Sequence, residues 1–143
     1  MLIIIKGKPK PLKRHRHTKK GFTYDPSYKD KKEFILKASY KKPVKPLEGA
    51  LRMQLAFYFY RPKKHFRTGR YSKELKKGVP YWHTTTPDLD NLEKMVADAL
   101  EMAGFYKNDS YIAQKQSEKI YCNPGEESRT EINLIQIDDG DKE

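Results

Sequence analysis

The residues with the clearest chemical potential are three aspartates in the second half of the chain. Asp88 and Asp90 are separated by a single leucine, and Asp109 follows nineteen residues after Asp90. Carboxylate oxygens are ligands that Mg²⁺ prefers, and an ion held by one or two carboxylates keeps positions for water and phosphate oxygens. Such an ion polarises phosphorus and lowers the pKa of a bound water. The three aspartates are therefore candidate metal ligands of a nuclease.

Lys94 is the candidate cationic neighbour of these carboxylates. It follows Asp90 by four residues, so the two side chains share one face if the segment is helical. An ammonium group there would stabilise charge on a leaving oxygen or orient a ligand. Each residue also has an ordinary structural interpretation: Asp88 as a helix cap, Asp90 and Lys94 as a surface ion pair, and Asp109 as a turn residue. Residue types and spacing leave both interpretations open.

The charge distribution favours a polyanionic partner. The chain has 143 residues and a net charge of +11. Residues 1–50 carry 15 Lys or Arg against 4 Asp or Glu, and residues 61–77 carry 8 against 1, whereas residues 78–143 carry 6 against 14. Clustered cations repel one another unless a polyanion neutralises them, and nucleic acid does so with release of counterions. We expect DNA contacts from Lys8, Lys10, Lys13, Arg14, Arg16, Lys19, Lys20, Arg67 and Arg70.

Cysteine content and hydropathy exclude several classes of protein. The single cysteine, Cys122, cannot form an intramolecular disulfide, which excludes a disulfide-stapled scaffold. No apolar run approaches the roughly 20 residues that span a bilayer, and residues 2–5 are too few for a signal peptide. We therefore expect a cytoplasmic protein, associated with the nucleoid when it acts, without a membrane partner.

Apolar periodicity predicts the elements that must position the aspartates. Strict alternation over residues 51–60 predicts the clearest strand, and apolar residues at helical spacing predict a helix over 89–103 that Gly104 ends. Two further strands are expected over 111–121 and 129–137. Asp109 lies near the start of the helix only if the loop 104–110 runs back along the helix. We expect that it does, and that the three aspartates lie close together.

The first half of the chain supplies the remaining elements. A short strand is expected over residues 1–5 and a helix over 27–41, on either side of a basic arm over 6–24. A second basic segment, 61–86, has no sustained period and is expected to be a loop. The fold class predicted is α/β (α+β): one domain over residues 1–137, with two main helices on a mixed sheet of about four strands. An acidic tail, 138–143, follows it.

The motif around the aspartates has a recognisable pattern. It consists of the run from Pro87 to Leu92, then Lys94, then Asp98-Ala99-Leu100, and finally Asn108-Asp109. This pattern resembles the RusA family of Holliday junction resolvases, the crossover junction endodeoxyribonucleases. The basic opening is also similar, and the similarity covers roughly residues 2–137 and is weakest across 61–86. One departure is Asn108, which stands where the family commonly has an acidic residue.

The resemblance implies a homodimeric endonuclease, dependent on Mg²⁺ with Mn²⁺ as a substitute. It would resolve four-way DNA junctions by paired symmetric nicks in recombination and repair, and such genes are often carried by phages or prophages. It implies Asp88, Asp90 and Asp109 as catalytic metal ligands, and Lys94 as their catalytic neighbour. Two nicks on strands of like polarity need two sites related by a two-fold axis, which supports the dimer. The alternatives are a non-catalytic basic nucleic-acid-binding protein and a related metal nuclease acting on flaps or forks.

Overall fold

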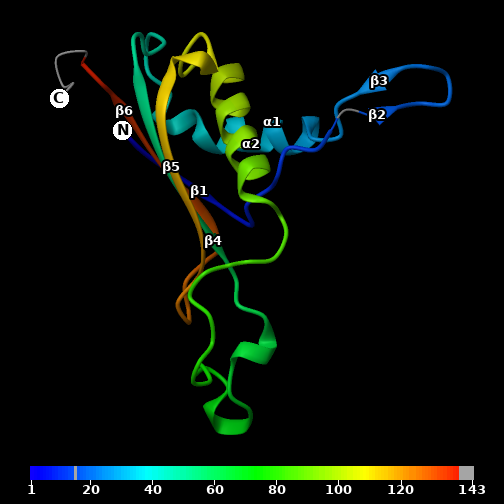
Figure 1. Cartoon of the computed structure of the whole chain (residues 1–143), viewed down its shortest axis with the longest axis vertical. Helices are drawn as coiled ribbons and strands as arrows, with labels where there is room; N and C mark the ends of the chain where they lie inside the picture. The colour runs from blue at the N-terminus through cyan, green and yellow to red at the C-terminus, as the bar shows by residue number, and fades with distance from the viewer. Residues whose placement is uncertain (15, 139–143) are drawn as a thin grey trace.

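A four-stranded mixed sheet forms the centre of the computed structural model, which describes residues 1–14 and 16–138 (Figure 1). Its order is β1-β6-β4-β5, and β6 runs antiparallel to β1 and β4 whereas β5 runs parallel to β4. The expected mixed sheet and single α+β domain are therefore confirmed. The strands are β1 (Leu2–Lys6), β4 (Leu51–Phe59), β5 (Ile112–Tyr121) and β6 (Arg129–Gln136). Apart from Asp138, the expected acidic tail lies outside the described residues.

The two predicted helices cover one face of this sheet (Figure 1). Along β4 every second residue is buried against them, as its alternating sequence predicts. Helix α1 (Tyr28–Ala38) contributes Phe34 to the core, and helix α2 (Leu89–Met102) contributes Leu92, Val96 and Leu100. Complete burial of a side chain of this size stabilises the fold by about 1.5–3 kcal/mol. The core therefore holds α2, which begins at the aspartate motif, firmly against the sheet.

The connection after α2 sets the direction of β5 relative to the helix. Gly104 has a φ of +87°, a left-handed conformation that ends the helix and that glycine adopts without steric cost. β5 then starts near the C-terminal end of α2, where the Asp109 N–H donates to Glu101 Oε1. It ends near the N-terminal end of α2, where Lys119 Nζ donates to the Pro87 carbonyl oxygen. β5 therefore runs back along α2.

Two segments project from the domain (Figure 1). The expected basic arm contains a hairpin of two short strands, β2 (Arg16–His17) and β3 (Thr23–Tyr24), which the sequence analysis missed because two residues show no alternation. The expected loop 61–86 contains two short 3-10 turns, η2 (Lys63–His65) and η3 (Gly69–Tyr71), and isolated bridges from Phe66 to Leu75 and from Trp82 to Ile120. No helix among the described residues is both long and apolar enough to cross a membrane.

A partly buried ion pair network joins the two helices. Lys31 Nζ of α1 lies 2.6 Å from Asp98 Oδ2 of α2 and 2.7 Å from Asp25 Oδ2, and the Lys31 side chain is only 6% exposed. Burial acts to lower the pKa of Lys31, but its hydrogen bonds and charge interactions with the two carboxylates raise that pKa above its ordinary value. Lys31 therefore stays charged and fixes α1 against α2.

Replacing Lys31 with methionine should lower the free energy of unfolding by about 2 kcal/mol, because the Asp98 carboxylate loses the ammonium group that it contacts in a partly buried site. Urea denaturation followed by circular dichroism measures this change. Lys29→Met removes the same charge from an exposed position of α1 and should cost less than about 0.5 kcal/mol. Equal losses in the two variants would contradict a specific role for Lys31.

Candidate active site

Two of the three predicted carboxylates lie together at the start of α2. Asp88 is the N-cap residue, with an extended backbone, and Asp90 lies in the first turn. Both residues are exposed. The Asp88 side chain accepts no capping hydrogen bond, so its carboxylate is not committed to the helix end.

Lys94 and the basic arm complete an open groove at this helix end. Lys94 Nζ lies 3.9 Å from Asp90 Oδ2, and both side chains are largely exposed to solvent. The Leu12 N–H donates to the Asn91 carbonyl oxygen at 2.9 Å, which holds the arm beside α2. The structure thus brings carboxylates and cations into one groove, whose charged lining residues are Asp88, Asp90, Lys94, Lys13 and Arg14.

Asp109 lies at the other end of α2. Its backbone N–H donates to Glu101 Oε1 at 2.8 Å, and Glu101 follows Asp88 by thirteen residues, which correspond to about 20 Å along the helix axis. The loop 104–110 therefore ends beside the C-terminal end of α2. Among residues 1–14 and 16–138, no group of three His, Cys, Asp or Glu side chains could hold a metal ion. The expected convergence of three aspartates does not occur within one chain.

The Asp109 carboxylate is exposed and takes no hydrogen bond or ion pair from any residue that the structure describes. It lines a second groove together with Lys94, Asp98 and the start of β5, and this groove shares Leu12 and Lys94 with the first. The side chain of the neighbouring Asn108, in contrast, forms a hydrogen bond. Its Oδ1 accepts a hydrogen bond from the Ser110 N–H at 2.9 Å and so caps the turn η4 (Asp109–Tyr111). Asn108 therefore shapes the turn that presents Asp109.

Sequence reasoning missed Lys119, which supports the segment before Asp88. Lys119 Nζ donates to the carbonyl oxygens of Thr85 and Pro87, each at 2.6 Å. Burial lowers the pKa of Lys119, and the charge of Asp88 partly opposes this shift. The lysine lies 31 residues after Asp88, so the sequence does not show its contacts with Thr85 and Pro87. They form because the end of β5 lies beside the start of α2. Lys119 is a positioning residue for the candidate site.

His83 is a second residue that the sequence did not single out. It is buried, and its ring stacks on Phe59 with the centroids 4.0 Å apart. Burial and then the charge of Lys119 lower the pKa of His83, so its ring is neutral near pH 7. Its Nδ1 has no hydrogen-bond partner within the described part of the chain. The stacked ring anchors the segment that leads from the projecting loop to Asp88.

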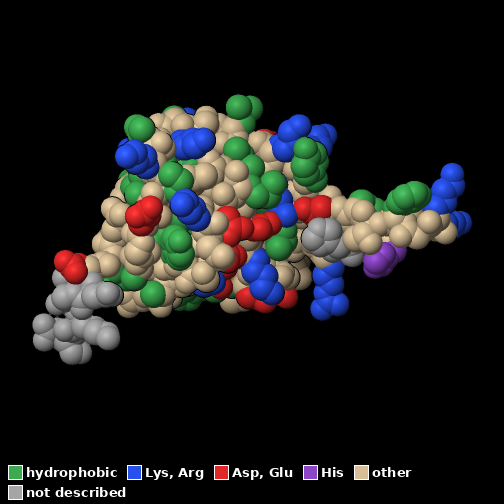
Figure 2. Space-filling model, turned by 90° about the horizontal axis from the view of Figure 1, so that it is seen from above, with side chains coloured by type: hydrophobic (Ala, Val, Ile, Leu, Met, Phe, Trp, Pro, Cys, Tyr) green, Lys and Arg blue, Asp and Glu red, His purple; other side chains and the backbone are tan. Residues whose placement is uncertain are grey.

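The predicted DNA-binding side chains are spread over several surfaces. Figure 2 shows acidic side chains across the middle of one face, with Lys and Arg side chains around them and along the projecting hairpin. Lys19 and Lys20 form the turn of this hairpin, between β2 and β3. On the loop 61–86, the Arg67 guanidinium lies over the Tyr71 ring at 4.0 Å, and Arg70 donates to the Tyr71 hydroxyl. The side chain of Arg16 lies outside the part that the structure describes.

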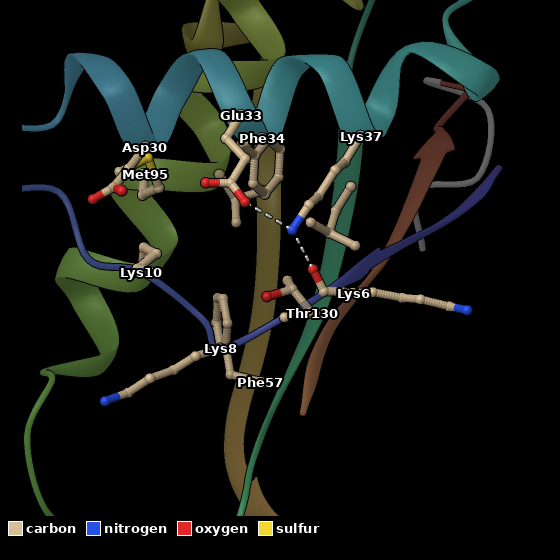
Figure 3. Close-up of a pocket in the computed structure, with 13 residues that line it drawn as sticks. Lys6, Lys8, Lys10, Asp30, Glu33, Phe34, Lys37, Phe57, Met95 and Thr130 are labelled. Carbon is tan, nitrogen blue, oxygen red and sulfur yellow. Dashed lines mark hydrogen bonds and ion pairs between the residues drawn. The ribbon is translucent and has the colours of Figure 1, made fainter. Parts of the chain in front are cut away.

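The start of the basic arm is fixed beneath α1 (Figure 3). Lys37 Nζ lies 3.1 Å from Glu33 Oε1 and donates to the Lys6 carbonyl oxygen at 2.7 Å. Lys8 and Lys10 line the same pocket, and the Lys8 ammonium points away from the Glu33–Lys37 pair (Figure 3). Lys8 is thus available to a ligand outside the pocket.

Comparison with known proteins assigns a family to this architecture. The family model described as endodeoxyribonuclease RusA matches residues 6–135. The chain is 31% identical over 107 residues to the uncharacterized protein YqaN of Bacillus subtilis (strain 168), an alignment that covers 74% of this chain and 72% of that protein. It is 33% identical over 67 residues to the crossover junction endodeoxyribonuclease rusA of Lactococcus phage r1t, which covers 47% of this chain and 49% of the phage protein.

Replacing Asp88 with alanine should change the free energy of unfolding by about 0.5 kcal/mol or less, because the side chain makes no capping hydrogen bond. Thermal or urea unfolding measures the change. Asp25→Ala is the comparison variant: Asp25 Oδ1 accepts from the Ser27 N–H at the start of α1 and Asp25 Oδ2 pairs with Lys31 at 2.7 Å, so losing both contacts should cost about 1 kcal/mol or more. A loss of that size at position 88 would show that Asp88 is mainly a helix cap.

Proposed function

The chain belongs to the RusA family of endodeoxyribonucleases, and from this membership we propose that it resolves four-way (Holliday) DNA junctions as a Mg²⁺-dependent homodimer. The family match covers residues 6–135. The observation that carries the proposal is the pair Asp88 and Asp90, free of capping bonds, beside Lys94 in a groove that the basic arm borders. A carboxylate pair within a DNA-binding surface repels phosphate unless a cation lies between the carboxylates and the phosphate.

The donor set fits a hard divalent cation. Mg²⁺ is usually held by one or two carboxylates together with water and substrate phosphates, and Asp88 and Asp90 provide two such groups on one exposed helix end. When bound, the ion supplies a polarised phosphate and a water of lowered pKa. Mn²⁺ accepts the same oxygen ligands and should substitute for Mg²⁺. Asp109 belongs to the proposed ligand set, although it lies at the far end of α2 in the same chain.

The chain's own residues have separate tasks in this proposal. Asp88 and Asp90 hold the cation, and Lys94 neutralises the charge that develops on the leaving oxygen. Lys13 and Arg14 contact the phosphates that lie in the groove, because they line it together with the carboxylates. Lys119 holds the backbone of residues 85–87 and thereby positions Asp88.

The remaining basic surfaces would contact the arms of the junction away from the cut. Lys19 and Lys20 lie on the projecting hairpin, and Arg67 and Arg70 lie on the other projecting segment (Figure 1). A four-way junction needs two cuts, and a homodimer provides two grooves related by a two-fold axis. The proposal extends to a role in recombination and repair in the cytoplasm and to a phage or prophage origin, which the similarity to a Lactococcus phage protein supports.

Asp90→Asn should reduce cleavage of a labelled synthetic four-way junction with Mg²⁺ by more than about 100-fold, because a metal ligand is lost. Binding without metal should be retained or become tighter, since one charge that repels phosphate is removed. Glu48→Gln removes an acidic charge from an exposed loop outside the groove and should cut like the wild type.

Three results would overturn parts of this proposal. Wild-type protein that binds junctions and leaves them intact with both Mg²⁺ and Mn²⁺ is a non-catalytic binding protein. Cutting of flaps or forks in preference to four-way junctions identifies a related nuclease. Equal cutting by Asp90→Asn and the wild type removes Asp90 from the active site.

The double variant Lys13→Gln/Arg14→Gln should reduce the slope of log affinity against log salt concentration by about 2, close to 0.9 for each lost phosphate contact on duplex arms. Fluorescence anisotropy with a labelled junction measures the slope. Lys41→Gln/Lys45→Gln removes two exposed charges outside the expected interface and should leave the slope unchanged. An unchanged slope for the first variant as well would exclude the arm from the interface.

A further inference from the structure

The turn between β2 and β3, at the tip of the projecting hairpin, has a defined conformation. The Thr18 N–H donates to the Phe22 carbonyl oxygen at 2.6 Å, and the Gly21 N–H donates to the Thr18 carbonyl oxygen at 3.0 Å. The Thr18 hydroxyl oxygen accepts from the Phe22 N–H at 3.1 Å. Gly21 has a φ of +84°, which glycine adopts without steric cost. These contacts hold the residues of the turn in a fixed direction relative to the two strands.

An aromatic side chain follows this turn and faces solvent. Phe22 is 68% exposed, and Tyr24 is exposed as well. Thr23 Oγ1 lies 2.9 Å from His17 Nδ1 across the hairpin. Because successive residues alternate between the two faces of a strand, Phe22 and Tyr24 lie on the face opposite to this pair. A single exposed apolar side chain is common on protein surfaces, so the surroundings of Phe22 decide what it binds.

The charge around Phe22 favours a polyanion. Lys19 and Lys20 precede it in the same turn, and both are exposed. The chain has no acidic residue before Asp25, so no carboxylate of the hairpin neutralises these lysines. Figure 2 shows Lys or Arg and hydrophobic side chains together on the projecting hairpin. An apolar ring beside ammonium groups is the chemistry of side chains that insert between bases while neighbouring cations contact phosphate.

The hairpin starts at the edge of the candidate active site. The Leu12 N–H donates to the Asn91 carbonyl oxygen of α2 at 2.9 Å, and the Lys13 N–H donates to Ser27 Oγ at 2.8 Å. Arg14, which lines the groove of Asp88 and Asp90, precedes Lys19 by five residues. Five residues span at most about 17 Å. The tip of the hairpin and the groove can therefore contact one DNA molecule at the same time.

A branch point is where such a ring inserts at the lowest cost. In a continuous duplex, two stacked base pairs must separate before a side chain enters between them. At a branch the stack is already interrupted, and an aromatic ring gains a stacking contact with an exposed base. We propose that the hairpin is a wedge: Lys19 and Lys20 contact phosphates of one arm of the junction, and Phe22 stacks on the base pair that ends this arm at the branch point.

This inference rests on the proposed function for its substrate, and binding without metal tests it. Phe22→Ala should weaken binding to a labelled four-way junction about tenfold, within the range for loss of one base–aromatic stack. Its affinity for a duplex of the same sequence should change less than twofold. Fluorescence anisotropy measures both affinities. Phe22→Trp keeps an aromatic ring and should restore most of the junction affinity, with unchanged circular dichroism in both variants.

Two control variants separate the ring from exposed apolar area and from charge. Val44→Ala shortens a fully exposed apolar side chain beside Lys45 and should bind both DNAs like the wild type. Lys19→Gln/Lys20→Gln removes phosphate contacts, so it should weaken binding to the junction and to the duplex by similar factors. Unchanged binding to both DNAs by this double variant would overturn the assigned phosphate contacts.

A junction that lacks the bases at its branch point tests the stacking partner directly. Wild-type protein should bind this abasic junction about tenfold more weakly than the intact one, whereas Phe22→Ala should bind the two junctions within about twofold of each other. The four affinities form a thermodynamic cycle in which only a contact between ring and base gives a coupling energy. A structural defect in Phe22→Ala would weaken binding to both junctions alike, and that result overturns the proposal.

The remaining outcomes separate this inference from the proposed nuclease function. Wild-type protein that prefers the junction through Phe22 but cuts no DNA with Mg²⁺ or Mn²⁺ overturns the nuclease function and supports the wedge. Wild-type protein that binds junction and duplex equally tightly overturns the wedge. Unchanged junction affinity in Phe22→Ala also overturns it, and Phe22 then serves a different partner, such as a protein or a lipid surface.

Discussion

The rigid length of α2 is the constraint on which the rest of the site depends. The helix runs from Leu89 to Met102 and is packed against the sheet by a buried apolar face, so it cannot shorten or bend to bring its ends together. Asp88 and Asp90 lie at one end and Asp109 lies beside the other, about 20 Å away. A helix of this length therefore keeps Asp109 apart from the other two aspartates of the same chain.

The second constraint is electrostatic. A surface that binds DNA must attract phosphate, whereas a site that holds Mg²⁺ must contain carboxylates, and the two requirements conflict at short range. The structure separates them spatially. The candidate ligand carboxylates lie at or beside the ends of α2, and lysines and arginines lie around the acidic side chains and along the projecting hairpin (Figure 2). Lys94 and the arm residues Lys13 and Arg14 adjoin both kinds of surface, so the charge of a bound cation and of the DNA can be balanced within one groove.

Stability and function share several side chains in this small domain. Lys31 joins α1 to α2 through Asp98 and so keeps the helix that carries the site in place. His83 stacks on Phe59 of the core, and Lys119 binds the backbone of residues 85 and 87, so the segment before Asp88 is held from both sides. The two projecting segments make fewer contacts with the core, which suits surfaces that must adjust to the shape of a branched nucleic acid.

The sequence by itself determined the elements and the residue types. Alternation in β4, helical spacing in α2 and the glycine after it are local signals, and local backbone preference and burial of one face produce the same elements in the folded chain. The aspartate motif and the family could likewise be read from residues close in sequence. Only the tertiary structure decided that β5 runs parallel to β4 at the sheet edge, that Lys119 supports Asp88, and that Asp109 lies at the wrong end of α2 for a site within one chain. These are relations between residues far apart in sequence, and they arise from strand pairing and helix packing, which no local pattern encodes.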